Sequence, residues 1–217
     1  MKAVIFGPPG SGKGTYASRL HAKLGVDVIA MGDIFREIMK QGSPLGTRVR
    51  GFVEKGSLVP DDVVIQVLEQ RLAKVSGVKG FILDGFPRTI EQAEALDKIV
   101  KIDVVIVLIV PDWIVVERLS TRRICRKCGE VYNVRYLRPK VKGVCDKCGG
   151  ELYQRSDDTA KVIKSRITIY ERQTKPILQH YDEIGIPVVE FKCEKLETLP
   201  EVAVESILKG LKKLNLA

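Results

Sequence analysis

The chain has 217 residues, of which 45% are hydrophobic and 29% are charged, so it can form one packed domain with insertions and is not a disordered chain. Its longest apolar run, Val104–Val110, has seven residues and ends at Pro111, whereas a membrane-spanning helix needs roughly 20. The N-terminal segment reaches Gly7 after four apolar residues, so we expect no signal peptide, no membrane partner and a cytoplasmic protein. The formal charge of +9 indicates an anionic partner without identifying it.

Short β-branched runs alternate with helical patterns along the chain. The first strand is expected at Lys2–Phe6, and a glycine-rich turn and a helix to about Leu24 follow it. Later strands are expected at Val26–Ala30, Phe81–Asp84, Val104–Val110 and Pro187–Phe191. The helices between and after them are expected at Ile34–Lys40, Pro60–Val75, Thr89–Val100, Asp112–Arg123, Thr159–Gln173 and Thr198–Leu211. Strands separated by helices predict an α/β fold with a parallel sheet, and unbroken apolar strands predict burial on both faces.

Two segments interrupt this alternation, and we interpret both as insertions into the sheet-based core. Gly32–Val59 has a helical pattern but no strand, and glycine and proline residues divide it. Ile124–Leu152 is rich in Gly, Cys, Lys and Arg and has little periodicity. Between Arg118 and Arg155, eleven basic and three acidic residues give a formal charge of +8 in 38 residues.

The sequence Gly7-Pro-Pro-Gly-Ser-Gly-Lys-Gly-Thr15 follows the first strand and opens the first helix. It matches the phosphate-loop pattern GxxxxGK[ST] at Gly7, Gly12 and Lys13, but its hydroxyl comes one residue late, at Thr15. Successive backbone N–H groups and the helix N-terminus bind anions, and a lysine neutralises phosphate charge. We therefore predict a phosphate site at this loop.

Asp84 ends the apolar strand Phe81–Asp84. Beside a phosphate loop, such a carboxylate holds Mg²⁺, directly or through water. The alternative is an aspartate that only begins the turn before Gly85.

Four of the five cysteines form two CxxC pairs, Cys125/Cys128 and Cys145/Cys148, with sixteen residues between the pairs. This spacing predicts a structural Zn²⁺ site, because four thiolates leave no open coordination position. The fifth cysteine, Cys193, is expected to be a small core residue. The surrounding Lys and Arg residues keep a nucleic-acid-binding zinc ribbon as an alternative.

Taken together, these motifs resemble those of the adenylate kinases, in the long form with a zinc-bearing lid. The resemblance rests on GPPGSGKGT at residues 7–15, Gly32–Arg36, Gly56–Asp61 and Asp84–Thr89, followed in order by Arg118, Arg122-Arg123, Val131-Tyr132, Arg155–Asp158 and Arg166. It implies a P-loop NTPase-type core of residues 1–30, 60–117 and 161–217, a monophosphate-binding insertion at 31–59 and a zinc-knuckle lid insertion at 118–160. It also implies reversible phosphoryl transfer from Mg-ATP to AMP, giving two ADP, by a monomer with no nucleic-acid partner.

Residue roles are implied at the matching positions. ATP would be bound by Gly10, Ser11, Gly12, Lys13, Gly14, Thr15, Arg118, Arg122, Val131, Tyr132 and the backbone near Lys195. AMP would be bound by Met31, Arg36, Ser57, Leu58, Val59, Gly85, Phe86, Pro87, Arg88, Gln92, Arg155 and Arg166. The implied catalytic residues are Lys13, Arg88, Arg122, Arg155 and Arg166. Because the acceptor phosphate is already ionised, catalysis needs positioning and charge neutralisation rather than a general base.

More ordinary explanations exist for several of these residues. Arg118 and Arg122 are expected one helical turn apart on one helix face, but single arginines are usually solvated. Gln92 fits a capping box with Thr89. Asp157 and Asp158, expected to contact the arginines or fasten the lid, could instead cap the helix that begins at Thr159.

One position departs from the family pattern. The family commonly has a hydroxyl residue where this chain has Met31, which would lie against the monophosphate base. Since methionine cannot make that hydrogen bond, we expect AMP to be preferred with looser base selectivity that rests mainly on Gln92. A kinase for UMP or CMP therefore stays an alternative.

Overall fold

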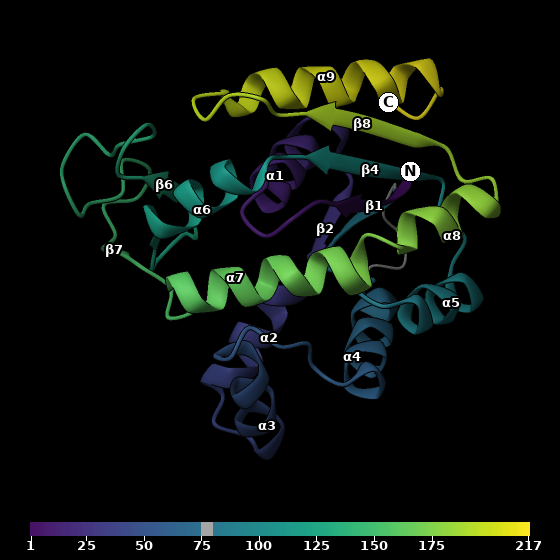
Figure 1. Cartoon of the computed structure of the whole chain (residues 1–217), viewed down its shortest axis with the longest axis horizontal. Helices are drawn as coiled ribbons and strands as arrows, with labels where there is room; N and C mark the ends of the chain where they lie inside the picture. Colours follow the sequence, from purple (N-terminus) through teal and green to yellow (C-terminus); the bar gives the residue numbers. More distant parts are fainter. Residues whose placement is uncertain (75–79) are drawn as a thin grey trace.

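The computed structural model describes residues 1–74 and 80–217, and a five-stranded parallel sheet lies at its centre (Figure 1). The strand order is β2-β3-β1-β4-β8, so the N-terminal strand lies in the middle. The strands are β1 (Lys2–Phe6), β2 (Asp27–Ala30), β3 (Phe81–Asp84), β4 (Val104–Ile109) and β8 (Val188–Lys192). The parallel register aligns the carboxyl ends of β1, β3 and β4, where α/β proteins bind their ligands.

Helices cover both faces of this sheet, which explains why its strands are apolar throughout. Ala3 and Ile5 of β1 pack into one hydrophobic cluster, and Val4 and Phe6 pack into the other. The first cluster includes residues of α1 (Lys13–Leu24), α6 (Asp112–Ser120), α7 (Ala160–Ile169) and α9 (Pro200–Lys213). The second includes residues of α4 (Asp61–Lys74), α5 (Ile90–Ile99) and α8 (Ile177–Glu183). Two-sided burial on a parallel sheet confirms the predicted α/β class.

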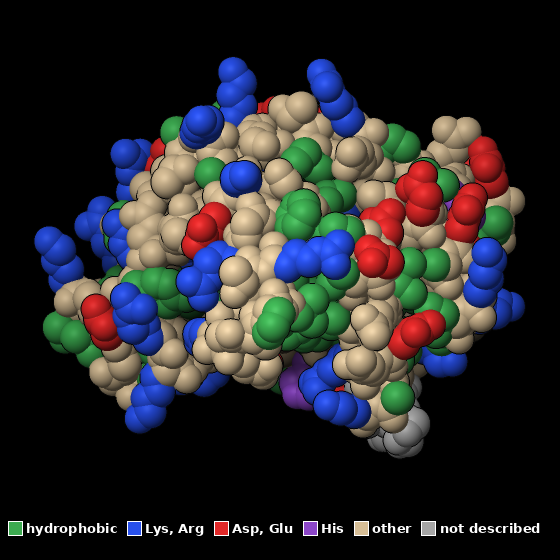
Figure 2. All heavy atoms as spheres, turned by 90° about the horizontal axis from the view of Figure 1, so that it is seen from below, with side chains coloured by type: hydrophobic (Ala, Val, Ile, Leu, Met, Phe, Trp, Pro, Cys, Tyr) green, Lys and Arg blue, Asp and Glu red, His purple; other side chains and the backbone are tan. Residues whose placement is uncertain are grey.

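The two insertions extend from the same end of the sheet. The first contains α2 (Met31–Lys40) and α3 (Pro44–Val53), which pack on each other below the sheet in Figure 1. The second contains a small antiparallel sheet of β5 (Arg122–Cys125), β6 (Val131–Asn133) and β7 (Leu152–Tyr153), in the order β6-β5-β7. Figure 2 shows Lys and Arg side chains gathered at the end of the molecule that carries this second insertion.

One predicted helix is wrong in a way that changes the site. The expected helix Asp112–Arg123 ends at Ser120, and Arg122 lies on β5, where it pairs with Asn133 of β6. Arg118 and Arg122 therefore do not share a helix face. The pairing of β5 with β6 and β7 outweighs the local helical pattern.

Other differences from the expected elements are smaller. The helix expected at Thr159–Gln173 is α7 followed by a π-helical turn, η1 (Tyr170–Thr174). The expected helix Pro60–Val75 corresponds to α4, with Val75 outside the described residues. Helix α3 lies within the segment Gly32–Val59, for which a helical pattern was expected, whereas α8 and the small sheet were not predicted. Of the helices described, none combines the length and the hydropathy that crossing a membrane requires.

Candidate active site

A cavity of about 1380 Å³ opens at the carboxyl ends of the central strands, between the two insertions. Residues of the phosphate loop, of both insertions and of the strand ends line it. Pockets for one small molecule usually measure about 300–1,000 Å³, so this cavity has room for two nucleotides.

The phosphate loop takes a backbone conformation that requires glycine, as Gly10 and Gly12 show. Gly10 has φ 75° and Gly12 has φ 102°, both in the left-handed region. A Cβ at Gly10 would lie 2.7 Å from Cγ of Leu119, and one at Gly12 would lie 2.7 Å from Cζ of Tyr16. The loop therefore packs tightly and presents the N-terminus of α1, which begins at Lys13, to the cavity.

Lys13 is held inside this loop. Its Nζ donates to the carbonyl oxygens of Gly7 at 2.6 Å and Pro8 at 2.9 Å. Burial lowers the pKa of Lys13 to about 8, and the charges of Arg88 and Arg166 add to this effect while that of Asp84 opposes it. The site thus carries more positive charge than its own carboxylates balance, as expected of a polyanion site.

Asp84 lines the cavity at the end of β3, next to the phosphate loop. Burial raises the pKa of its carboxyl, and the charge of Lys13 opposes that rise. A Cβ at Gly14 would lie 3.2 Å from Oδ2 of Asp84, so a serine or threonine at position 14 would crowd this carboxylate. A half-buried carboxylate beside a phosphate loop fits Mg²⁺, which prefers oxygen ligands.

Two aspartates hold two of the predicted arginines. Arg122 donates to both oxygens of Asp158, from Nε at 2.9 Å and from a terminal nitrogen at 2.6 Å. Arg166 donates to Asp157 at 2.8 Å. Thr159 is the N-cap of α7, and no side chain among the described residues caps that helix. The two carboxylates therefore bind arginines rather than the helix end.

Two more arginines meet at Asp33, a site residue that the sequence analysis did not identify. Arg36 forms an ion pair with Asp33, and a terminal nitrogen of Arg155 lies 3.7 Å from the same carboxylate oxygen. The Nε of Arg155 is buried, and none of the described residues accepts its hydrogen. Burial, followed by the charges of Arg122 and Arg36, lowers the pKa of Arg155 to about 10. An unpaired buried donor costs free energy, so this geometry favours an anionic ligand.

Arg88 also lines the cavity, and its Nε donates to the carbonyl oxygen of Gly85 at 2.8 Å. Gln92 is 1% exposed and accepts a hydrogen bond from the backbone N–H of Arg88 at 2.8 Å. Thr89 caps α5 by accepting from the backbone N–H of Gln92 at 3.2 Å. Only one half of the capping box is present, because the Gln92 side chain turns to Arg88 instead.

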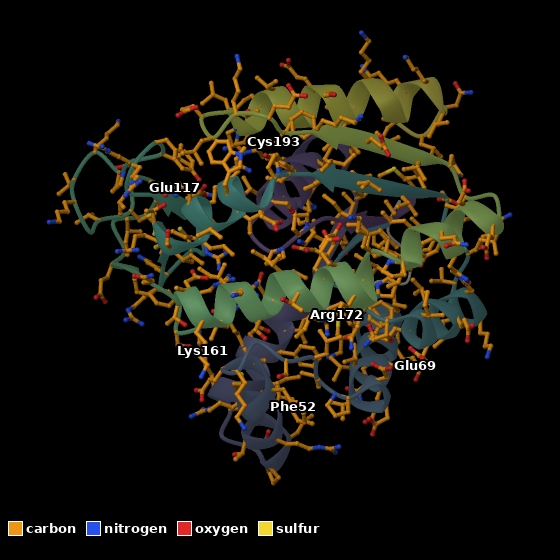
Figure 3. The ribbon with its side chains drawn as sticks, in the orientation of Figure 1. Phe52, Glu69, Glu117, Lys161, Arg172 and Cys193 are labelled. Atoms are coloured by element: carbon orange, nitrogen blue, oxygen red, sulfur yellow. The ribbon has the colours of Figure 1, made fainter. Side chains whose placement is uncertain are left out.

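Arg118 joins the phosphate loop to the segment that follows β8. Its guanidinium donates to Sγ of Cys193 at 3.1 Å and, at 3.4 Å, to the carbonyl oxygens of Ser11 and Leu196. Figure 3 shows Cys193 beyond the end of β8. Cys193 is buried, as predicted, and it also orients Arg118. Tyr136, which the sequence analysis missed, lines the cavity here, and burial raises its pKa to about 12.

The cavity brings most of the predicted residues together but not all of them. Among the described residues, its lining lacks six of the predicted ones: Ser11, Met31, Ser57, Val59, Gln92 and Lys195. Met31 is 1% exposed and packs in the core cluster with Ile29 and Phe35. Neighbouring residues of the segment after Lys195, such as Thr198, do line the cavity.

The four paired cysteines come together in the second insertion, and their sulfur atoms all lie within 4.8 Å of one another. Sγ of Cys125 lies 3.4 Å from that of Cys148, and Sγ of Cys128 lies 3.6 Å from that of Cys145. Zn–S bonds of about 2.3 Å in a tetrahedron place sulfurs about 3.8 Å apart, so the cluster fits Zn²⁺. All five cysteines of the described chain are free thiols.

Tyr132 connects this cluster to the cavity. Its hydroxyl lies 3.5 Å from Sγ of Cys145 and accepts from the backbone N–H of Asp146 at 2.8 Å. Tyr132 and the adjacent Val131 both line the cavity. The metal site therefore forms part of one wall of the cavity, whose lining includes Cys125 and Cys128.

Known proteins share this combination of features. The family model described as adenylate kinase matches residues 5–186. The chain is 48% identical over 191 residues to an adenylate kinase of Carboxydothermus hydrogenoformans, a match that covers 86% of this chain and 89% of that protein. It is 47% identical over 191 residues to that of Archaeoglobus fulgidus (86% and 88%) and 45% identical over 208 residues to that of Caldicellulosiruptor bescii (93% and 97%). The chain therefore belongs to the adenylate kinase family, the phosphotransferases that convert ATP and AMP reversibly into two ADP.

Proposed function

We propose that the chain performs this reaction in the cavity at the carboxyl end of the sheet, with ATP on the phosphate loop and AMP toward the first insertion. The observation that carries the proposal is the charge of this cavity. Lys13 and all six of the arginines predicted from the sequence line it, and burial together with mutual repulsion lowers the pKa of several of them. Two polyanions meeting there would supply the missing negative charge.

In this proposal the backbone of residues 10–15 and Lys13 bind the ATP phosphates, and Arg118, Val131 and Tyr132 lie beside its base and ribose. Arg36 and Arg88 bind the AMP phosphate. Arg122, Arg155 and Arg166 neutralise the phosphoryl group in transit. Met31, Ser57, Val59, Gln92 and Lys195 also belong to the proposed nucleotide-binding set, although the cavity lining of the described residues does not include them.

The chemistry follows from these positions. An oxygen of the AMP phosphate attacks the terminal phosphorus of ATP, and the bond from that phosphorus to the bridging oxygen breaks, which leaves ADP on both sides. The attacking oxygen carries no proton, so no general base is needed. The guanidinium groups of the arginines hold the equatorial oxygens of the phosphoryl group in transit, and they stabilise the negative charge that spreads over these oxygens in the transition state. Mg²⁺, which would lie near Asp84, neutralises phosphate charge when it is bound with ATP.

We further propose that residues 118–160 act as a lid and residues 31–59 as the monophosphate-binding segment, on a core of 1–30, 60–117 and 161–217. A lid is required because water in the cavity would compete with AMP for the phosphoryl group. Zn²⁺ on Cys125, Cys128, Cys145 and Cys148 would stabilise the lid. Free thiols in metal-binding pairs support a cytoplasmic location. A cavity built from one chain supports a monomer, which light scattering would test.

A coupled assay with ATP and a panel of monophosphates tests the function. Lys13→Ala and Arg88→Ala should each lower kcat by about 10²–10³, because each removes a charge donor from the transition state. Arg172→Ala is the matched control, since Arg172 is an exposed arginine on η1, outside the cavity lining of the described residues (Figure 3). Near-normal turnover of either site variant with normal circular dichroism would refute the proposal, and faster turnover of CMP or UMP than of AMP would refute the proposed acceptor.

A further inference from the structure

A chain of hydrogen bonds runs from Asp61 to the backbone of Arg88. Oδ1 of Asp61 accepts from Nε2 of Gln92 at 2.6 Å, and Oε1 of Gln92 accepts from the backbone N–H of Arg88 at 2.8 Å. The other carboxylate oxygen of Asp61 accepts from the hydroxyl of Thr89 at 3.1 Å. Asp61 begins α4, 27 residues before Arg88 in the sequence, and it lies outside the cavity lining formed by the described residues.

The charge of Asp61 determines which way the Gln92 amide points. An ionised carboxylate can only accept hydrogen bonds, so the NH₂ group of Gln92 must face Asp61. The carbonyl oxygen of the same amide must then face the N–H of Arg88. Gln92 is 1% exposed, so water cannot easily replace either partner.

The carbonyl side of Arg88 is held as well. Its oxygen accepts from the hydroxyl of Thr174, a buried residue at the end of η1, at 3.1 Å. The Arg88 guanidinium in turn donates from Nε to Gly85. Both peptide groups of Arg88 are therefore restrained by side chains, Gln92 of α5 and Thr174 of η1, and Asp61 of α4 holds the first of these.

We infer that Asp61 is a positioning residue for Arg88, which acts through Gln92 and Thr89 without touching a nucleotide. This inference rests on the proposed role of Arg88 at the phosphates. Displacing a phosphate-binding group by about 1 Å can lower a rate about 100-fold, so the orientation of the Arg88 backbone affects turnover directly. The start of α4 is also a favourable place for a carboxylate, because the helix N-terminus is partially positive.

Asp61→Asn is the informative substitution, because it keeps the size of the side chain. An asparagine offers one acceptor and one donor end where Asp61 offers two acceptors, so one of the two hydrogen bonds must change. If its NH₂ group faces Gln92, the Gln92 amide must turn and two donors meet at the N–H of Arg88. If its NH₂ group faces Thr89, the hydroxyl of Thr89 loses its acceptor. Asp62→Asn is the matched control, since Asp62 lies in the same first turn of α4 and is exposed.

The experiment measures kcat, the KM for AMP, the dissociation constant for ATP and the melting temperature. We expect Asp61→Asn to lower kcat/KM for AMP about 10- to 100-fold, while ATP binding changes less than about twofold. Asp62→Asn should change neither by more than about twofold. In an Arg88→Ala background, Asp61→Asn should cause no further loss, because the group that it positions is gone.

The inference would be overturned if Asp61→Asn lowered kcat/KM for AMP equally in the unsubstituted and the Arg88→Ala backgrounds. It would also be overturned if Asp61→Asn were as active as Asp62→Asn. If Asp61→Asn melts below the assay temperature, Thr89→Val takes its place, alone and combined with Arg88→Ala, and Ser43→Ala is its control. Ser43 caps α3 by accepting from Gly46 at 3.1 Å, so its loss costs a helix cap outside this cluster. The proposed function fails separately, if the unsubstituted chain and Asp62→Asn both transfer no phosphoryl group to AMP.

Discussion

The ion pair between Arg122 and Asp158 joins the two ends of the second insertion, and its contribution to stability can be tested quantitatively. Asp158 is 0% exposed at its side chain and Arg122 is 15% exposed, and two hydrogen bonds of 2.9 and 2.6 Å join them. Asp158→Asn removes one charge and leaves the guanidinium of Arg122 buried without its counter-ion. Breaking a buried pair in this way costs about 3–5 kcal/mol. Because Arg122 borders the cavity, water can hydrate it in part, so we expect about 3 kcal/mol.

For a chain of this length, each kcal/mol lowers the melting temperature by about 2–4 °C, so Asp158→Asn should lower it by about 6–12 °C. Calorimetry and chemical unfolding of the nucleotide-free protein would measure both quantities. Glu151→Gln is the matched control, because Arg126 and Glu151 form a pair of 2.9 Å in the same insertion with side chains 58% and 70% exposed. Exposed pairs contribute less than about 1 kcal/mol. Equal losses in the two variants, or a loss below about 1 kcal/mol for Asp158→Asn, would refute the reasoning.

Four further predictions concern the cavity, the metal site and the core. At pH 9, the protein should take up a proton when it binds ATP, because the phosphates raise the pKa of Lys13 from about 8. Calorimetry in buffers of different ionisation enthalpy should show this uptake, and Lys13→Arg should abolish it. Below about pH 8 the folded and unfolded chains both keep the proton on Lys13, so the lowered pKa should reduce the free energy of unfolding of the nucleotide-free protein by its full amount. This reduction should disappear as the pH approaches 10.5, where the unfolded chain also loses the proton. Purified protein should contain one Zn²⁺ per chain, and a stoichiometry near zero would contradict the assignment. Removal of the Zn²⁺ should lower the melting temperature, and added Cd²⁺ should restore stability and activity together. Met31→Thr should lower the free energy of unfolding by about 3 kcal/mol, because it removes apolar contacts and buries a hydroxyl. If this substitution leaves the ratio of kcat/KM for AMP and CMP unchanged, Met31 does not contact the base.

Local patterns in the sequence determined the features that depend on nearby residues. The phosphate loop needs glycine where the backbone turns left-handed, at Gly10 and Gly12, and a lysine at the start of α1. Strands buried on both faces must be apolar along their whole length, so Phe81–Asp84 and the residues of β4 were recognisable without the fold. The zinc site was equally evident, because each CxxC turn supplies two ligands on its own.

Tertiary structure decided where the charged side chains lie. Arg122 left the helix that its local sequence favours, because β5 pairs with β6 and β7 and because Asp158, 36 residues away, binds its guanidinium. Asp33 pairs with Arg36 one turn along α2, but it meets Arg155 only because the two insertions face each other across the cavity. Gln92 and Met31 are buried beside the cavity rather than in its lining, and that follows from packing on the sheet. Such contacts join residues far apart in the chain, so no local periodicity or propensity records them, and only the folded arrangement determines which charges meet.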